Sequence, residues 1–202
     1  MSYEDFVRLV PPGVQAEWVD GAVIVMTTDR RHVRLSRLLT GFLSSFVTIF
    51  DLGRVFGQPF LMRARPGGPG REPDIIVVLA DHQDRVKPKG IEGPADLAIE
   101  FVSDESVTRD RIEKRAEFAA AGVPEYLVIE SREGRTGCWF YRLGPNGDYV
   151  EIEPDVQGRY HSAVLPGLWF DPLWFVQEPL PTPELLLKRI APDAYTAWFL
   201  AQ

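Results

Sequence analysis

The chain has 202 residues, 45% of them hydrophobic and 25% charged, which is typical of a globular protein with one well-buried core. Its one cysteine excludes an internal disulfide framework. No apolar run approaches the roughly 18 residues that span a bilayer, and the first residues lack the pattern of a signal peptide. We therefore expect a cytoplasmic protein without a membrane segment. The net charge of −7 does not favour DNA binding, although the arginines are grouped.

The first predicted element is a β-hairpin. Residues 14–19 and 22–27 have strand composition and flank Asp20-Gly21, a favoured type I′ turn pair. That turn would pair Glu17 with a residue of the second strand and place its carboxylate on a largely apolar face.

A long helix is predicted next, from about residue 30 to residue 50, because leucines and phenylalanines recur there at helical spacing. Thr28 or Asp29 can cap its start. His32 falls in the first turn, on the same arc as the leucines.

The rest of the chain alternates strands with helices. We expect an extended segment at 54–63, strands at 74–79, 96–102, 125–129, 138–143 and 148–153, and helices at 108–121 and 184–200. This order predicts a mixed α/β (α+β) fold, with a central mixed sheet flanked by helices, an N-terminal hairpin and a C-terminal helix. We expect a single domain over 1–202, with its core at about 14–153 and a C-terminal extension at about 160–202.

Three apolar stretches each contain one polar residue that a core would disfavour: Asp74, Glu100 and Lys114. Both faces of the strand at 96–102 are apolar, so it is predicted to be central, and Glu100 is the only charge within it. An ionised group in such a place costs several kcal/mol unless it is paired or binds a metal. The alternatives are that Glu100 pairs with an arginine and only fixes register, and that Asp74 is a turn residue.

Helical geometry places Lys114 in the middle of an apolar arc formed by Val107, Phe118 and Ala121. Its ammonium would then either extend along that arc to water or point to an anionic site. Two carboxylates on neighbouring strands are ligands that suit Mg²⁺, which keeps waters and accepts substrate phosphate.

The order of these motifs resembles the Uma-two family of restriction endonucleases, which belongs to the PD-(D/E)XK nuclease superfamily. The resemblance covers most of the chain. Its residues are Glu17-Trp-Val-Asp-Gly21, His32, Glu-Pro-Asp74, Asp96-Leu-Ala-Ile-Glu100-Phe-Val-Ser103, Arg109-Asp110 with Lys114, Ala120-Ala-Gly-Val-Pro-Glu-Tyr126 and Leu165-Pro-Gly-Leu168.

The resemblance implies a restriction-endonuclease-like core in which Asp74 and Glu100 bind a divalent metal, with the backbone carbonyl of Phe101 as a third ligand. The superfamily usually has a lysine two residues after the second acid, where this chain has Val102; the family resembled here places it on the following helix, where Lys114 matches. Further polar positions of the family are matched by Glu17, which would bind the metal through water, by His32, and by Asp110, which would hold Lys114. His32 would either donate to a phosphate or be a core histidine bound to a backbone carbonyl.

The predicted function is that of a Mg²⁺- or Mn²⁺-dependent endonuclease acting on DNA. Arginines close to the site, Arg31, Arg34, Arg109 and Arg111, would hold the phosphate backbone, while two acids at 104 and 105 would weaken that contact. A homodimer is the simplest way to supply two sites for two strands. The alternatives are a catalytically silent nuclease-fold module that binds nucleic acid or a protein, and an assembly protein that dimerises through the aromatic residues of the tail.

Overall fold

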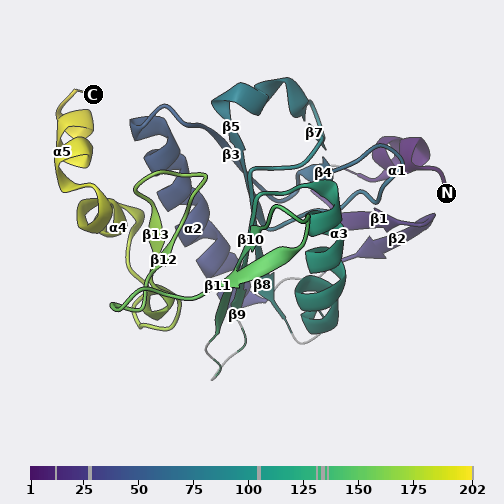
Figure 1. Ribbon diagram of the computed structural model, residues 1–202. Coiled ribbons are helices and arrows are strands. Elements are labelled where there is room, and N and C mark those ends of the chain that lie inside the picture. The colour runs from purple at the N-terminus through teal and green to yellow at the C-terminus, as the bar shows by residue number, and fades with distance from the viewer. Residues whose placement is uncertain are drawn as a thin grey trace.

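The centre of the molecule is a six-stranded mixed sheet (Figure 1). The structure, a computed structural model, describes residues 1–11, 13–26, 29–103, 106–130, 132, 135 and 137–201, so our predictions for Thr27, Thr28, Asp104 and Glu105 lie outside it. The strand order is β11-β10-β9-β8-β5-β3, and only β8 and β9 are parallel neighbours in this sheet. The bounds are β3 Gly53–Gly57, β5 Ile75–Leu79, β8 Leu97–Val102, β9 Glu125–Glu130, β10 Cys138–Leu143 and β11 Tyr149–Ile152.

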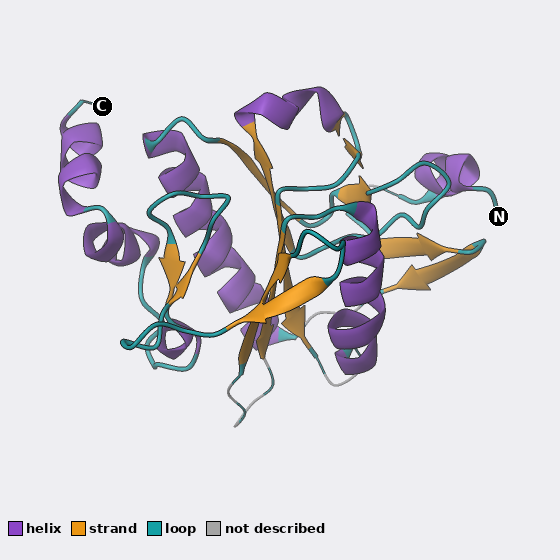
Figure 2. Ribbon diagram, in the orientation of Figure 1, coloured by secondary structure: helices purple, strands orange, loops and turns teal. Residues whose placement is uncertain are grey.

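Helices cover both faces of this sheet (Figure 2). The long helix α2 (Arg30–Ile49) packs on one face together with the tail helices α4 (Pro183–Ile190) and α5 (Pro192–Leu200). Helix α3 (Lys114–Ala121) packs on the other face, with a second apolar cluster beneath it. The predicted mixed sheet between helical layers is therefore confirmed.

Smaller elements surround the sheet. They are the helix α1 (Tyr3–Leu9), the hairpin β1 (Ala16–Val19) and β2 (Ala22–Val25), the parallel pair β4 (Leu61–Arg63) and β7 (Gly90–Glu92) with β6 (Val86–Lys87), the pair β12 (Tyr160–His161) and β13 (Trp169–Phe170), and the 3₁₀ turns Ala80–Arg85 and Pro172–Phe175. Of the described helices, none is long and apolar enough to cross a membrane.

The hairpin has the predicted register. Val19 pairs with Ala22 and Glu17 with Ile24. Asp20 and Gly21 both have positive φ, as a type I′ turn requires. The position of Glu17 on the buried side of the hairpin follows from this turn.

Three of the predicted elements differ from the structure. The segment at 54–63 is broken after Gly57, near Pro59, whose ring nitrogen has no hydrogen for a strand ladder, and β4 belongs to a separate sheet. The tail helix is interrupted at Ala191, because Pro192 disfavours helical conformation at the preceding residue. The helix at 108–121 begins with a π-helical turn, Arg109–Glu113, before α3.

The aromatic residues of the tail are mostly core. Phe170, Trp174 and Phe175 are buried against α2, and Trp169 and Trp198 pack partly buried at the edge of the same cluster. Phe199 is exposed, so the assembly alternative stays a prediction.

Candidate active site

The two predicted acids lie opposite each other where β5 and β8 diverge. The last pair in this antiparallel ladder is Ile75 with Ile99. Continuing the register by one residue sets Asp74 across from Glu100, and both side chains line one pocket. The end of the ladder therefore juxtaposes the two carboxylates.

The side chain of Asp74 also accepts a backbone hydrogen bond from β8, beyond the last pair of the β5–β8 ladder. The backbone N–H of Phe101 donates to Oδ2 of Asp74 at 2.6 Å. In a strand the N–H and C=O of one residue face the same neighbour. The carbonyl of Phe101 therefore faces the side of β8 on which Asp74 lies, where a third metal ligand was expected.

His32 approaches Asp74 from α2. Nε2 of His32 lies 2.9 Å from Oδ1 of Asp74, and the imidazole packs edge-on against the ring of Phe101. Asp29 fixes this turn by accepting the N–H of His32 at 2.8 Å, as an N-cap. Burial lowers the pKa of His32, but the contact with the Asp74 carboxylate outweighs burial and raises the pKa above 6.5. The histidine thus pairs with a carboxylate and not with a backbone carbonyl.

Lys114 is fully buried and does not extend to water. Its ammonium nitrogen lies 2.6 Å from Oε1 of Glu100, 2.8 Å from Oε1 of Glu17 and 3.4 Å from Oδ1 of Asp110. Burial disfavours the charged amine, yet these three carboxylates raise its pKa above the ordinary value. Glu100 therefore pairs with a lysine and not, as one alternative held, with an arginine.

The π-helical turn determines what each residue of this segment faces. Arg109 and Asp110 point to the cleft between β5 and β8, and Lys114 begins the regular helix one turn later. The hydroxyl of Tyr126, on β9, donates to the carbonyl of Asp110 at 2.8 Å and ties the turn to the sheet. Single π turns are frequent at functional sites.

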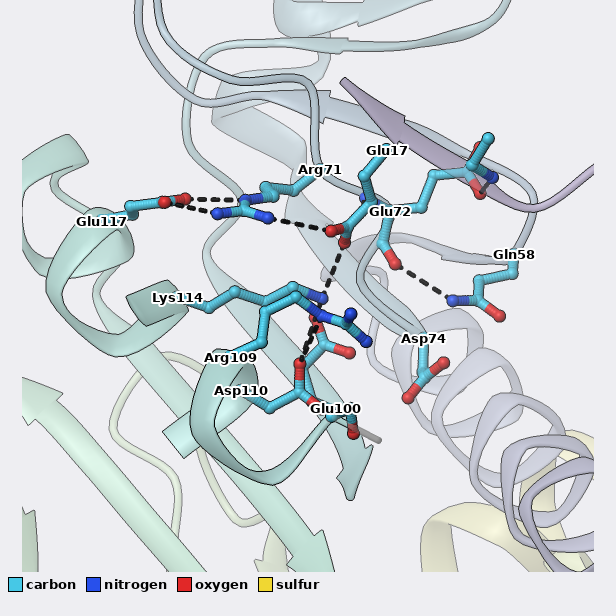
Figure 3. Close-up of polar contacts among 12 residues, drawn as sticks. Glu17, Gln58, Arg71, Glu72, Asp74, Glu100, Arg109, Asp110, Lys114 and Glu117 are labelled. Carbon is cyan, nitrogen blue, oxygen red and sulfur yellow. Dashed lines mark hydrogen bonds and ion pairs between the residues drawn. The ribbon is translucent and has the colours of Figure 1, made fainter. Parts of the chain in front are cut away.

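A chain of ion pairs runs from Lys114 through Glu17 and Arg71 to Glu117 on α3 (Figure 3). Glu17 accepts from the guanidinium of Arg71 at 2.9 Å, and Arg71 also makes a bidentate contact with Glu117. Burial raises the pKa of Glu17, but Lys114 and Arg71 outweigh it and lower the pKa below 4.5. The sequence analysis missed the role of Arg71, because an arginine in a Gly/Pro-rich loop carries no periodic signal; its place just before the Glu-Pro-Asp74 motif was the available sign.

Buried carboxylates outnumber buried basic groups at this site. Burial raises the pKa of Glu100 well above its ordinary value, more than the nearby Lys114 lowers it, and burial raises the pKa of Glu72 to about 7. Five buried carboxylates surround the buried cations Lys114 and Arg71: Glu17, Glu72, Asp74, Glu100 and Asp110. Such a site favours the binding of protons or of a cation.

The acids open into a small pocket. Its wall contains both predicted metal-binding acids, together with Phe101, His32 and Arg109. Lys114 and Glu17 do not line this pocket and lie behind Glu100. The remaining lining residues are Val25, Met26, Ser103, Ser106 and Asp110.

The donor set of this pocket fits a hard divalent cation that takes few protein ligands. Oδ1 of Asp74 is buried and, despite its proximity to His32, has no hydrogen bond of acceptable geometry. No group of three or more His, Cys, Asp or Glu side chains among the described residues is arranged as a metal cluster. Two carboxylates and a backbone carbonyl would leave most positions to water, as Mg²⁺ prefers.

The four predicted phosphate-binding arginines do not converge. Arg109 lines the pocket, whereas Arg111 lies over the ring of Trp139 in a separate groove. The other two arginines are engaged near the tail: Arg31 donates to the carbonyls of residues 132 and 175, and Arg34 pairs with the carboxylate of Glu178.

The sequence of the chain matches a known protein family. Residues 3–173 match the Uma2 family, described as "Putative restriction endonuclease". The crystal structure of a "putative nuclease belonging to DUF820" from Anabaena variabilis ATCC 29413 is similar in fold, with a TM-score of 0.67 and 17% identity over 86% of this chain and 96% of that chain. No curated protein matches the chain. Because the family match spans most of the sequence, the chain belongs to the Uma2 family.

Proposed function

We propose that this protein is a Mg²⁺- or Mn²⁺-dependent endonuclease that hydrolyses phosphodiester bonds of DNA. The observation that carries the proposal is that Asp74 and Glu100 line one pocket just beyond Ile75–Ile99, the last pair of the β5–β8 ladder. Membership of the Uma2 family supports a nuclease activity.

Each residue of the site has a proposed role. Asp74, Glu100 and the carbonyl of Phe101 would hold the cation. When bound, Mg²⁺ would polarise the scissile phosphate and make water a better nucleophile. His32 orients Asp74, and Arg109 is placed to bind the substrate phosphate at the pocket.

Lys114 acts through Glu100 in this arrangement. Its ammonium contacts Oε1 of Glu100 and is enclosed by Glu17 and Asp110, so it fixes the orientation of the carboxylate and compensates its charge. A direct contact of Lys114 with the anionic substrate, one of the two alternatives left open for its ammonium, stays a prediction.

Cleavage of supercoiled plasmid tests the activity. We expect nicking and linearisation by the wild type with Mg²⁺ or Mn²⁺, and loss of both in Asp74→Asn, Glu100→Gln and Lys114→Ala. Asp81→Asn is the matched control, because this acid is exposed and lies outside the pocket. The proposal fails if the wild type does not cleave, or if Lys114→Ala cleaves equally well.

Thermal unfolding tests the metal separately from the activity. A cation that binds only the folded state raises the melting temperature with its concentration. We expect Mg²⁺ and Mn²⁺ to raise that of the wild type and of Asp81→Asn, and not that of Asp74→Asn. An equal rise in Asp74→Asn would place the cation elsewhere.

A second candidate function is a nuclease-fold module that binds nucleic acid or a protein without cutting. It is favoured by the absence of a metal cluster of three acids or histidines among the described residues, and by the engagement of Glu100 with Lys114. Metal titration discriminates the two, because a silent module need not show a Mg²⁺ affinity that depends on Asp74.

For cleavage of both strands we propose a homodimer, since each chain provides one pocket for one scissile phosphate. Light scattering of the protein with and without duplex DNA tests this. The homodimer is contradicted if the protein stays monomeric with DNA and yet converts supercoiled plasmid directly to the linear form, without a nicked intermediate.

A further inference from the structure

A second groove adjoins the active-site pocket at His32. It has a volume of about 490 Å³, within the range of ligand-binding pockets. His32 lines both cavities, so the groove continues the pocket along the outer face of α2. Its residues on the helix include Ser36, Arg37 and Thr40, which follow one another at the spacing of a helix face.

The charge of this groove is opposite to that of the acidic pocket. Arg37 and His32 are the ionisable residues of its wall, and no carboxylate lines it within the described residues. Arg37 is exposed, and no hydrogen bond or ion pair engages it in the part of the chain that the structure describes. Arg34, one turn earlier, is instead held by Glu178. Of the arginines on this helix, Arg37 is thus the one placed at the groove and available to an anion.

The remaining wall suits a sugar-phosphate chain. Ser36 and Thr40 are short hydroxyl side chains, and the backbone of Gly57 forms the opposite side. Gln15 and Gln58 contribute amides. Nε2 of Gln58 donates to the carbonyl of residue 72, so the amide oxygen Oε1 is left to accept a hydrogen bond from a base edge.

We propose that one strand of nucleic acid leaves the active-site pocket past His32 and lies in this groove, with a backbone phosphate on Arg37. This rests on the proposed function and adds the path of the substrate. Arg37 lies five residues after His32, about 7.5 Å along the helix axis. Arg37 would therefore contact a backbone phosphate close to the one cleaved.

Binding of a short fluorescein-labelled single-stranded DNA, measured by anisotropy in EDTA so that cleavage does not interfere, tests the path. We expect Arg37→Ala to weaken binding about five- to tenfold and to reduce the slope of log K against log salt by about 0.7, the share of one phosphate on a single strand. Ser36→Glu, which adds a carboxylate to the groove and leaves Arg37 in place, should weaken binding at least as much.

Arg8→Ala is the matched control, because Arg8 is an exposed arginine that is paired with Asp5 and does not line the groove. It should bind as the wild type does, and circular dichroism confirms that each variant is folded. The path is wrong if Arg37→Ala and Ser36→Glu bind like the wild type, or if Arg8→Ala loses as much as Arg37→Ala.

The plasmid assay separates this failure from failure of the proposed function. Cleavage by the wild type together with unchanged binding by Arg37→Ala would overturn the groove and leave the nuclease. Absence of wild-type cleavage together with binding that depends on Arg37 would overturn the nuclease and support the groove as a nucleic-acid site.

Discussion

Replacing Lys114 with methionine is the most direct perturbation of the site. Methionine is a flexible side chain that fills the space of the stem but carries no charge. The change leaves Glu100 and Asp110 without the ammonium, while Glu17 keeps Arg71. Removing one partner of a buried ion pair costs about 3–5 kcal/mol, so we expect a loss of that size in the free energy of unfolding at neutral pH.

The pH dependence of the variant follows from the same contacts. Burial already raises the pKa of Glu100 with Lys114 present, and without the amine the folded state will hold that proton more firmly. A folded state that binds more protons than the unfolded state loses stability as pH rises. Above the unfolded pKa of glutamate, near 4.3, the loss should approach about 1.4 kcal/mol per pH unit for each proton retained.

Urea unfolding of the wild type and Lys114→Met between pH 5 and pH 8 measures both effects. The double variant Lys114→Met with Glu100→Gln is the control, because it removes one of the carboxylates left uncompensated. It should be more stable than Lys114→Met alone at pH 8, and its stability should vary less with pH. A loss under about 1 kcal/mol, or equal pH slopes in the wild type and Lys114→Met, would refute the reasoning.

Three further changes test the neighbouring contacts by the free energy of unfolding. Because the pKa of His32 is raised, the stability contributed by its pairing with Asp74 is fully present below pH 6.5 and is lost as pH rises through the folded pKa. His32→Gln should therefore lower the free energy of unfolding more at pH 6 than at pH 8. An equal loss at both pH values would contradict the pairing. Asp29→Ala should cost about 1 kcal/mol and Asp29→Ser much less, because serine also caps helices. An equal cost for the two variants would show that the cap is not formed. Arg71→Lys should lose about 2 kcal/mol, because an ammonium cannot bridge the acids as the guanidinium does; stability like the wild type would show that the bridge is unimportant.

The part of the site that follows from strand periodicity could be predicted. Alternation along β8 assigned Glu100 to the face of Ala98 and Val102, and those two residues pack under α3 while Ile99 and Phe101 pack under α2. Side chains alternate between the two faces of any strand because of the backbone geometry, so this assignment can be made from a single sequence. The hairpin register at Asp20-Gly21 was predictable for the same reason, because the turn type fixes the pairing.

The contacts that depend on long-range pairing do not follow from the local sequence pattern, and the shared site of Asp74 and Glu100 was expected from the family resemblance. Asp74 lies opposite Glu100 only because β5 and β8 pair with Ile75 against Ile99, and nothing in either strand alone specifies that register. The ion pair of Arg71 with Glu17 joins a loop to a hairpin more than fifty residues away. Ideal helical geometry placed Lys114 in an apolar arc but left open whether its ammonium reaches water, and it does not include the π turn that precedes α3.

The position of the lysine on the helix changes what it can do. A lysine at position 102 would lie on the same strand face as Glu100, two residues along the open edge of the site. Val102 there is fully buried in the apolar cluster under α3, and Lys114 reaches Glu100 from above. Coming from the helix, the amine meets Glu17 and Asp110 as well, and it leaves the pocket wall to Asp74, Glu100 and Arg109. Under the proposed function, this arrangement gives the contact with substrate phosphate to Arg109 and the orientation of the Glu100 carboxylate to Lys114.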